Sequence, residues 1–145
     1  MPGRITLWGA GEILNVFFSQ TADPPPVIYL ALIKDVAPTP YVSGAELDEP
    51  TAAEYARVGI TSNHLNWTNE GAIQIMVCEA DLSFATAQED WGTIRYWALC
   101  NAEVDGFVYF VGNFDDPEIV NDGDTVIVSG GDLTVSLGPF FSEEG

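Results

Sequence analysis

Residues 93–113 read TIRYWALCNAEVDGFVYFVGN, two apolar runs that flank the polar segment NAEVDG at 101–106. The apolar runs are rich in aromatic and β-branched residues, which favour strands, whereas the acidic residues and glycine between them favour a turn. The sequence therefore predicts a β-hairpin whose strands are Thr93–Cys100 and Phe107–Asn113.

Similar runs occur on both sides of this hairpin, with turn signals roughly every 8–12 residues. We expect further strands at Val27–Ile33, Tyr55–Thr61, Ile73–Cys78, Thr125–Ser129 and Leu133–Leu137. The last two flank Gly130, Gly131 and Asp132 and are expected to form a second hairpin, because glycine readily adopts the positive φ of a tight turn. Polar or proline-rich connections are expected at Asp35–Pro50, Asn63–Gly71, Asp81–Asp90 and Asp115–Asp124.

The N-terminal segment has a different hydrophobic period. Its apolar residues recur at spacings of three and four, which predicts an amphipathic helix over about residues 5–19. Thr6 is expected to cap this helix, and the prolines at 24–26 prevent its continuation. One helix followed by about seven short strands indicates a mainly β protein, an antiparallel β-sandwich or barrel with one N-terminal α-helix.

The length of 145 residues is typical of one domain. We therefore expect a single domain over residues 1–145, with the helix at about 5–19, a β-domain at about 27–137 and a short acidic C-terminal tail at 138–145. The 47% of hydrophobic residues is sufficient for a core that needs no disulfide framework.

The charge balance excludes several classes of partner. The chain has 22 acidic and 4 basic residues, a formal net charge of -18, and its cations Arg4, Lys34, Arg57 and Arg95 are scattered along the sequence. Binding to nucleic acid or to an anionic membrane surface requires clustered cations, so neither partner is expected. Because there is neither a secretory signal pattern nor a long apolar run, we expect a soluble protein that is not secreted.

No residue pattern indicates catalysis. Cys78 and Cys100 lie in apolar runs and are expected to be buried free thiols, and His64 is the single histidine, which rules out a histidine-rich metal site within one chain. We therefore expect no enzyme activity, no cofactor and no metal. The carboxylates at 115–124 leave open a calcium- or carbohydrate-binding β-module as an alternative, although they lack the order of a calcium-binding loop.

Six short motifs occur in an informative order. They are VIYLAL at 27–32, VSGAEL at 42–47, EYAR at 54–57, DWGTI at 90–94, GDT at 123–125 and GDLTV at 131–135. Together they resemble a tailed-bacteriophage structural family that is often labelled phage tail fibre-like or head decoration protein. The resemblance covers about Ile5 to Leu137.

This resemblance implies a non-enzymatic virion structural protein, assembled in the host cytoplasm. The first expectation is a capsid decoration or cement protein that binds the major capsid protein on the outer surface of the head and stabilises capsomer junctions. A homo-oligomer is expected, with a trimer favoured. The alternative is a tail- or tail-fibre-associated protein that binds tail proteins. The negative charge favours an outward position, because packed DNA phosphates would repel it.

Two groups of residues are candidates for specific roles. Structural roles are expected for Tyr55, Arg57, Trp91 and Trp97, with Arg57 paired to a carboxylate, for which we propose Asp90. Assembly contacts are expected at Trp8, Leu14, Phe17 and Phe18 of the helix and at Pro38, Pro40 and Tyr41 of the proline-rich loop. The alternative for the helix aromatics is that they cover the core.

Overall fold

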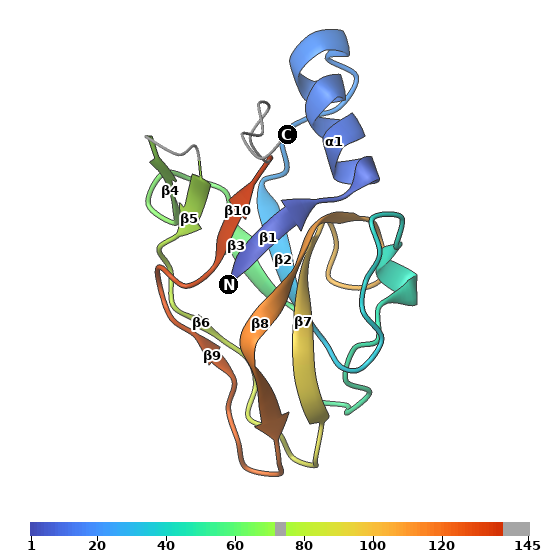
Figure 1. Cartoon of the computed structure of the whole chain (residues 1–145), viewed down its shortest axis with the longest axis vertical. Helices are drawn as coiled ribbons and strands as arrows, with labels where there is room; N and C mark the ends of the chain where they lie inside the picture. The colour runs from blue at the N-terminus through green and yellow to red at the C-terminus, as the bar shows by residue number, and fades with distance from the viewer. Residues whose placement is uncertain (72–74, 138–145) are drawn as a thin grey trace, which may run out of the picture.

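The computed structural model describes residues 1–71 and 75–137 (Figure 1). The expected acidic tail 138–145 and the beginning of the predicted strand Ile73–Cys78 lie outside these residues. The described helices are α1 (Leu7–Leu14), a π-helical turn (Asn15–Ser19) that continues it, and a short 3-10 turn (Gly44–Glu46). The described strands are β1 (Pro2–Ile5), β2 (Val27–Ile33), β3 (Val58–Thr61), β4 (Trp67–Glu70), β5 (Ile75–Cys78), β6 (Leu82–Ser83), β7 (Gly92–Cys100), β8 (Val108–Val120), β9 (Ile127–Val128) and β10 (Thr134–Ser136).

The mainly β fold with one N-terminal α-helix is confirmed. Eight strands form a curled sheet in the order β3-β2-β7-β8-β1-β10-β5-β4, and β6 pairs with β9 in a separate ladder (Figure 1). The pairing is not entirely antiparallel, because β1 runs parallel to β10. The residues of β1, Pro-Gly-Arg-Ile, have little strand propensity, and their hydrogen bonds come from strands more than 100 residues away in the chain.

The predicted central hairpin is confirmed, and its second strand is longer than expected. Strands β7 and β8 are antiparallel, with Leu99 opposite Phe110 and Gly92 opposite Val120. Much of the predicted polar connection Asp115–Asp124 is therefore strand, which corrects that prediction. Its acidic residues are exposed, so strand pairing does not require their burial.

The predicted second hairpin is wrong. Strand β9 pairs with β6, whereas β10 pairs with β1 and β5. The turn does form, with Gly131 at φ +94° and Asp132 N donating to Ser129 O at 3.1 Å. This turn connects strands of two different ladders, because β9 and β10 each pair with strands that are distant in the sequence.

Two other strand boundaries differ from the sequence-based expectations. The predicted turn Asn63–Gly71 contains β4, which pairs antiparallel with β5. Strand β3 begins at Val58 and not at Tyr55, because residues 55–57 support the side-chain cluster described below. The turn was predicted at β4 because an asparagine-rich composition favours turns locally. Pairing with the apolar strand β5 overrides this local preference.

The core surrounds Trp97, whose side chain is fully buried in β7. Gly3 of β1 and Gly112 of β8 lie opposite each other beside this ring. A Cβ atom would come within 2.1 Å of the Trp97 ring at Gly3 and within 2.5 Å at Gly112. The two glycines therefore leave the space that the indole occupies.

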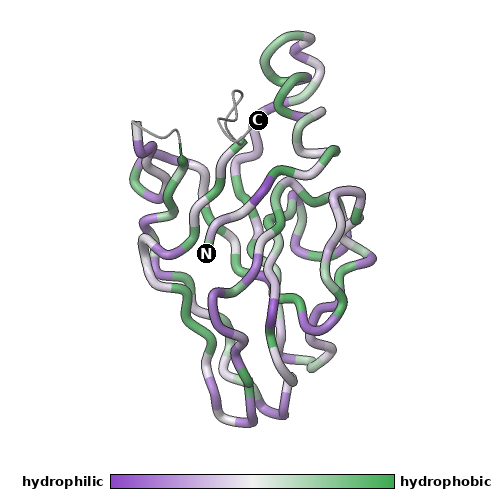
Figure 2. The backbone as a smooth tube through the Cα atoms, in the orientation of Figure 1, coloured by the Kyte–Doolittle hydropathy of each residue, from purple (hydrophilic) through white to green (hydrophobic). Residues whose placement is uncertain are grey.

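A second apolar cluster lies on the other face of the sheet. It contains Ala31, Ile33, Ala98, Cys100 and Val108, with Val42 and Leu47 from loop 35–50 packed against it. The predicted burial of β2 on both faces is confirmed for Leu30–Ile33. Figure 2 shows further hydrophobic stretches along the helical segment that extends from the body, whereas the turns at the opposite end are more hydrophilic.

Candidate assembly surface

Arg57 and Glu49 form the centre of a polar cluster beneath loop 35–50. Arg57 Nε donates to Glu49 Oε1 at 2.9 Å, and Arg57 Nη2 donates to Glu49 Oε2 at 2.8 Å. The Tyr55 hydroxyl donates to Glu49 Oε1 at 2.7 Å and accepts a hydrogen bond from Leu32 N at 3.0 Å. The predicted pairing of Arg57 with Asp90 is wrong, because Glu49 reaches the guanidinium with both oxygens.

The other Arg57 bonds connect this loop to the β7–β8 turn. Nη1 donates to Ala102 O at 2.8 Å and to Asp105 O at 2.9 Å, and Nη2 donates to Gly44 O at 3.2 Å. A Cβ at Gly44 would lie 1.8 Å from Asp105 O, so only glycine allows this approach. The VSGAEL and EYAR motifs thus meet on the turn of the central hairpin.

The DWGTI motif is connected to EYAR by a second carboxylate. Glu54 Oε2 accepts hydrogen bonds from Trp91 Nε1 and Gln88 N, both at 2.8 Å. These bonds, with the Gln88 amide as the larger contribution, hold the pKa of Glu54 below its usual value. Asp90, proposed as the partner of Arg57, instead accepts a hydrogen bond from Asp122 N at 2.9 Å. The four residues for which structural roles are expected, Tyr55, Arg57, Trp91 and Trp97, all pack within the body.

The base of α1 is attached firmly to β8. As predicted, Thr6 caps the helix, with Gly9 N donating to Thr6 Oγ1 at 2.9 Å. Thr6 N donates to Tyr109 O at 2.8 Å, and a Cβ at Gly9 would lie 2.4 Å from the same carbonyl. Trp8 stacks on Phe107, with ring centroids 4.8 Å apart. These contacts set the direction in which the helix leaves the sheet.

The helical segment extends away from the sheet (Figure 1), and several of its apolar side chains are exposed. Leu7 and Leu14 are each 56% exposed, Phe17 is 74% exposed and Phe18 is 76% exposed. Phe17 and Phe18 contact each other edge to face, with centroids 5.4 Å apart. Of the helix aromatics, Trp8 packs against the body, whereas Phe17 and Phe18 do not cover the core.

The proline-rich loop lies beside the base of this helix. Leu7 N donates to Pro40 O at 3.1 Å, and Tyr41 is exposed. The structure thus places Pro40 near the helix, whereas Pro38 lines a separate groove. Leu7 lies within the predicted helix but was not among the residues expected to make assembly contacts. Its position seven residues before Leu14, on the same side of a helix, is the sequence signal that assigns it to the same exposed surface.

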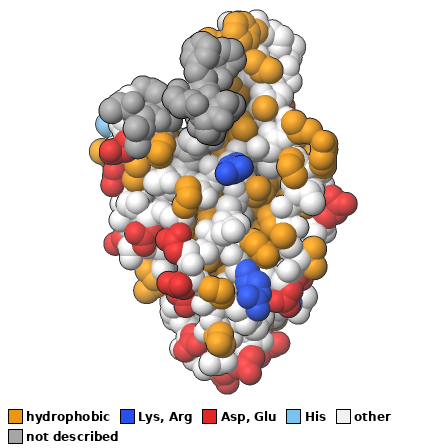
Figure 3. All heavy atoms as spheres, viewed as in Figure 1, with side chains coloured by type: hydrophobic (Ala, Val, Ile, Leu, Met, Phe, Trp, Pro, Cys, Tyr) orange, Lys and Arg blue, Asp and Glu red, His pale blue; other side chains and the backbone are white. Residues whose placement is uncertain are grey.

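The outer face of the sheet carries basic and hydrophobic side chains together. Figure 3 shows basic side chains in the middle of this view among hydrophobic ones, with acidic side chains mostly toward the edges. Arg95 pairs with Asp35 at 3.3 Å, an exposed interaction. Arg4 has no ion pair among the residues that the structure describes.

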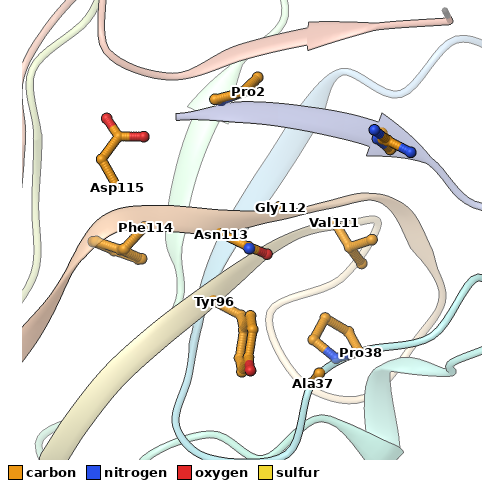
Figure 4. A pocket seen from close by; sticks show the side chains of 10 residues that line it. Pro2, Ala37, Pro38, Tyr96, Val111, Gly112, Asn113, Phe114 and Asp115 are labelled. Atoms are coloured by element: carbon orange, nitrogen blue, oxygen red, sulfur yellow. The ribbon is translucent and has the colours of Figure 1, made fainter.

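An open groove of about 600 Å³ lies on the sheet face where loop 35–50 ceases to cover it (Figure 4). In Figure 4, Tyr96 and Val111 face Pro38 across the groove, and Asp115 lies near one end. Arg4 also lines it. Its lining mixes aromatic, aliphatic and charged groups.

Within residues 1–71 and 75–137, no group of three or more His, Cys, Asp or Glu side chains is arranged to hold a metal ion. Cys78 and Cys100 are free and buried, as predicted. None of the described helices has the length and apolar character needed to span a membrane. The described features that remain as candidate interaction sites are the apolar helix surface and the groove.

Comparison with known families shows the family to which the chain belongs. Residues 5–136 match the family model Gp80, described as podophage GP4 fiber I protein gp80. The chain belongs to the Gp80 family. This family places the protein among phage virion structural proteins and implies a location in the virion. A search of curated proteins found no match.

Proposed function

We propose that this Gp80-family protein is a fibre-associated structural subunit of a phage virion, and that it acts by binding other virion proteins without catalysing a reaction. Support for a fibre rather than a capsid decoration comes from the description of the family, which names a fibre protein. No contact in the described residues specifically favours a capsid.

The observation that carries the proposal is the exposed apolar surface of α1 and the turn that follows it. Leu7, Leu14, Phe17 and Phe18 are all more than half exposed. Burying one such side chain contributes about 1.5–3 kcal/mol relative to leaving it in water. The surface is therefore suited to assembly, because a partner that covers several of these side chains gains substantial stability.

The acidic body complements this role. With a net charge of -18, copies repel one another over roughly a Debye length, about 8 Å at physiological salt. This repulsion restricts association to neutral or cation-bearing surfaces. We further propose that the protein is a homo-oligomer, with a trimer as the favoured state, and that its charged surface faces outward.

The decisive experiment is to locate the protein on purified virions. Gold-labelled antibody against a tagged subunit is expected to mark fibres in electron micrographs. Label distributed over the heads would overturn the fibre proposal and would support capsid decoration. In parallel, purified protein should bind particles that lack the fibre but should not bind emptied, expanded heads.

The competing class of function is a calcium- or carbohydrate-binding module. Thermal unfolding should be measured with and without calcium and with a panel of sugars. We expect an unchanged midpoint. A midpoint that rises with ligand concentration would instead favour a calcium- or carbohydrate-binding function, because a ligand that binds the folded state stabilises it.

A further inference from the structure

We infer that one stripe of the N-terminal helical segment is the contact between copies of this chain. The stripe consists of Leu7, Gly11, Leu14 and Phe18 and is called the seam below. This inference deepens the proposed structural role and rests on it, because it names a second copy of the chain as the occupant of the exposed helix surface.

The spacing of the seam is the first argument. Its residues are separated by four, three and four positions, which places them on one side of a helix and is the spacing through which helices pack against each other. Of the seam residues, Leu7 bonds to the body through its backbone amide, which donates to Pro40 O. The described side-chain and close-packing contacts with the body come from other positions, since Gly9 lies against Tyr109 and Trp8 stacks on Phe107. The seam is therefore available to a neighbour.

Charge is the second argument and favours a second copy over a basic partner. Glu12 is the only charged residue in the sequence from Leu7 to Ser19, although the whole chain has 22 acidic residues. A basic partner would find few acidic groups to pair with at this surface. A second copy presents an equally neutral and apolar seam, so here two strongly acidic bodies can meet with little repulsion.

Gly11 is the third argument. Glycine within a helix costs about 1 kcal/mol relative to alanine. At Gly9 the body explains this cost, because a side chain would collide with Tyr109 O. At Gly11 the described chain offers no such reason, since an added Cβ would meet nothing within 4 Å. A neighbouring helix explains the glycine, which leaves a hole between Leu7 and Leu14 for a partner side chain.

The base of the helix that carries the seam is also held in place before association. The Thr6 cap, the bond from Leu7 N to Pro40 O and the Trp8 stack hold the helix base. Ordering costs on association are correspondingly small. Because the seam side chains are exposed, polar substitutions there should leave the folded monomer intact.

The test compares self-association of matched variants by sedimentation equilibrium at micromolar to submillimolar concentrations. Wild type should be oligomeric, and Leu14→Glu or Phe18→Glu should weaken association at least about tenfold, as expected for central contacts. Leu65→Glu is the control, because Leu65 is 73% exposed but lies far from the seam in sequence, in the turn before β4. It should associate like wild type.

Gly11→Leu separates packing from helix stability. Leucine has a higher helix propensity than glycine, so the thermal midpoint of the monomer should not fall. Association should nevertheless weaken, because the hole between the helices is filled. A Gly11→Leu variant that associates as tightly as wild type would contradict the role assigned to this glycine.

Cysteine crosslinking tests the same contact in particles. Leu14→Cys should form an interchain disulfide on mild oxidation, whereas Leu65→Cys should not, and the native thiols are buried and should not compete. A monomeric wild type with no Leu14→Cys crosslink in particles would overturn the inference, as would an oligomer unaffected by Leu14→Glu and Phe18→Glu. Fibres that are labelled in micrographs but give no crosslink would refute the seam while leaving the proposed function standing.

Discussion

Arg57 and Glu49 form a bidentate ion pair inside the protein, with N–O distances of 2.9 and 2.8 Å. The pair holds loop 35–50 against the turn between β7 and β8. Every described hydrogen bond of the guanidinium is accepted by Glu49 or by a backbone carbonyl oxygen. Arg57 therefore satisfies acceptors that would otherwise need water as a hydrogen-bond donor. This arrangement leads to the first prediction.

Arg57→Met should destabilise the protein by about 3–5 kcal/mol, because it leaves a partly buried carboxylate and several carbonyl oxygens without their donor. Chemical unfolding measures this change. The matched control is Arg95→Met, which removes an exposed ion pair with Asp35 and should change stability by no more than about 1 kcal/mol. Similar losses for both variants would contradict the structural role of Arg57.

Gly112→Ala should destabilise the protein by about 1–3 kcal/mol, because the new methyl group collides with the Trp97 ring. The change can be measured by chemical unfolding together with the near-ultraviolet circular dichroism of tryptophan. Gly11→Ala, measured at concentrations where the protein is monomeric, is the control, because an added Cβ there meets nothing within 4 Å of the chain itself, and it should be neutral or stabilising by up to about 1 kcal/mol. If Gly112→Ala were equally harmless, the packing of Trp97 described above would be incorrect.

Acid should weaken the connection between Glu54 and Trp91. The pKa of Glu54 in the folded protein lies below its ordinary value of 4.5, mainly because of the Gln88 amide and then the Trp91 indole. Stability from this group is therefore present above the unfolded pKa and is lost as the pH falls through the lower folded pKa.

The measurement is the thermal midpoint of wild type and Glu54→Gln as the pH is lowered to about 3, where an ordinary glutamate is protonated. Wild type should lose more stability than Glu54→Gln on acidification, because the amide does not titrate. Glu103→Gln, at an exposed position, should follow wild type. Parallel curves for wild type and Glu54→Gln would show that Glu54 does not contribute in this way.

Cys100 should be unreactive in the native protein. Burial raises the pKa of its thiol to about 12, and burial also raises the pKa of Cys78. Because the thiolate is the reactive form, alkylation at mildly alkaline pH should be slow for both residues until the protein is unfolded. Mass spectrometry after native and denatured labelling counts the modified thiols, and rapid native labelling would disagree with the observed burial.

Several elements were predictable because their signals are local. The aromatic and β-branched run at β7, the polar turn after it and the apolar run of β2 depend on residues close together in sequence. The spacing of Leu7, Leu14 and Phe18 likewise predicts the helix, and Thr6 its cap. The exposure of the helix surface was not predictable, because the same pattern describes a helix that covers a core.

Other features depend on contacts between distant segments. Strand β1 forms because β8 and β10 provide hydrogen-bond partners on its two sides, although its own residues scarcely favour a strand. The strands β9 and β10 follow a well-formed turn but pair elsewhere. Arg57 could be expected to bind some carboxylate, yet the choice of Glu49 over Asp90 depends on where loop 35–50 crosses the sheet.

Composition, charge and local pattern were thus sufficient for a mainly β, acidic protein with one N-terminal helix and an interior of buried thiols and aromatics. The three-dimensional arrangement was needed to show which strands pair, which carboxylate meets Arg57 and which apolar side chains stay in solvent. The physical reason is that propensity and periodicity act over a few residues. Pairing and burial, in contrast, depend on surfaces that come together only when the whole chain has folded.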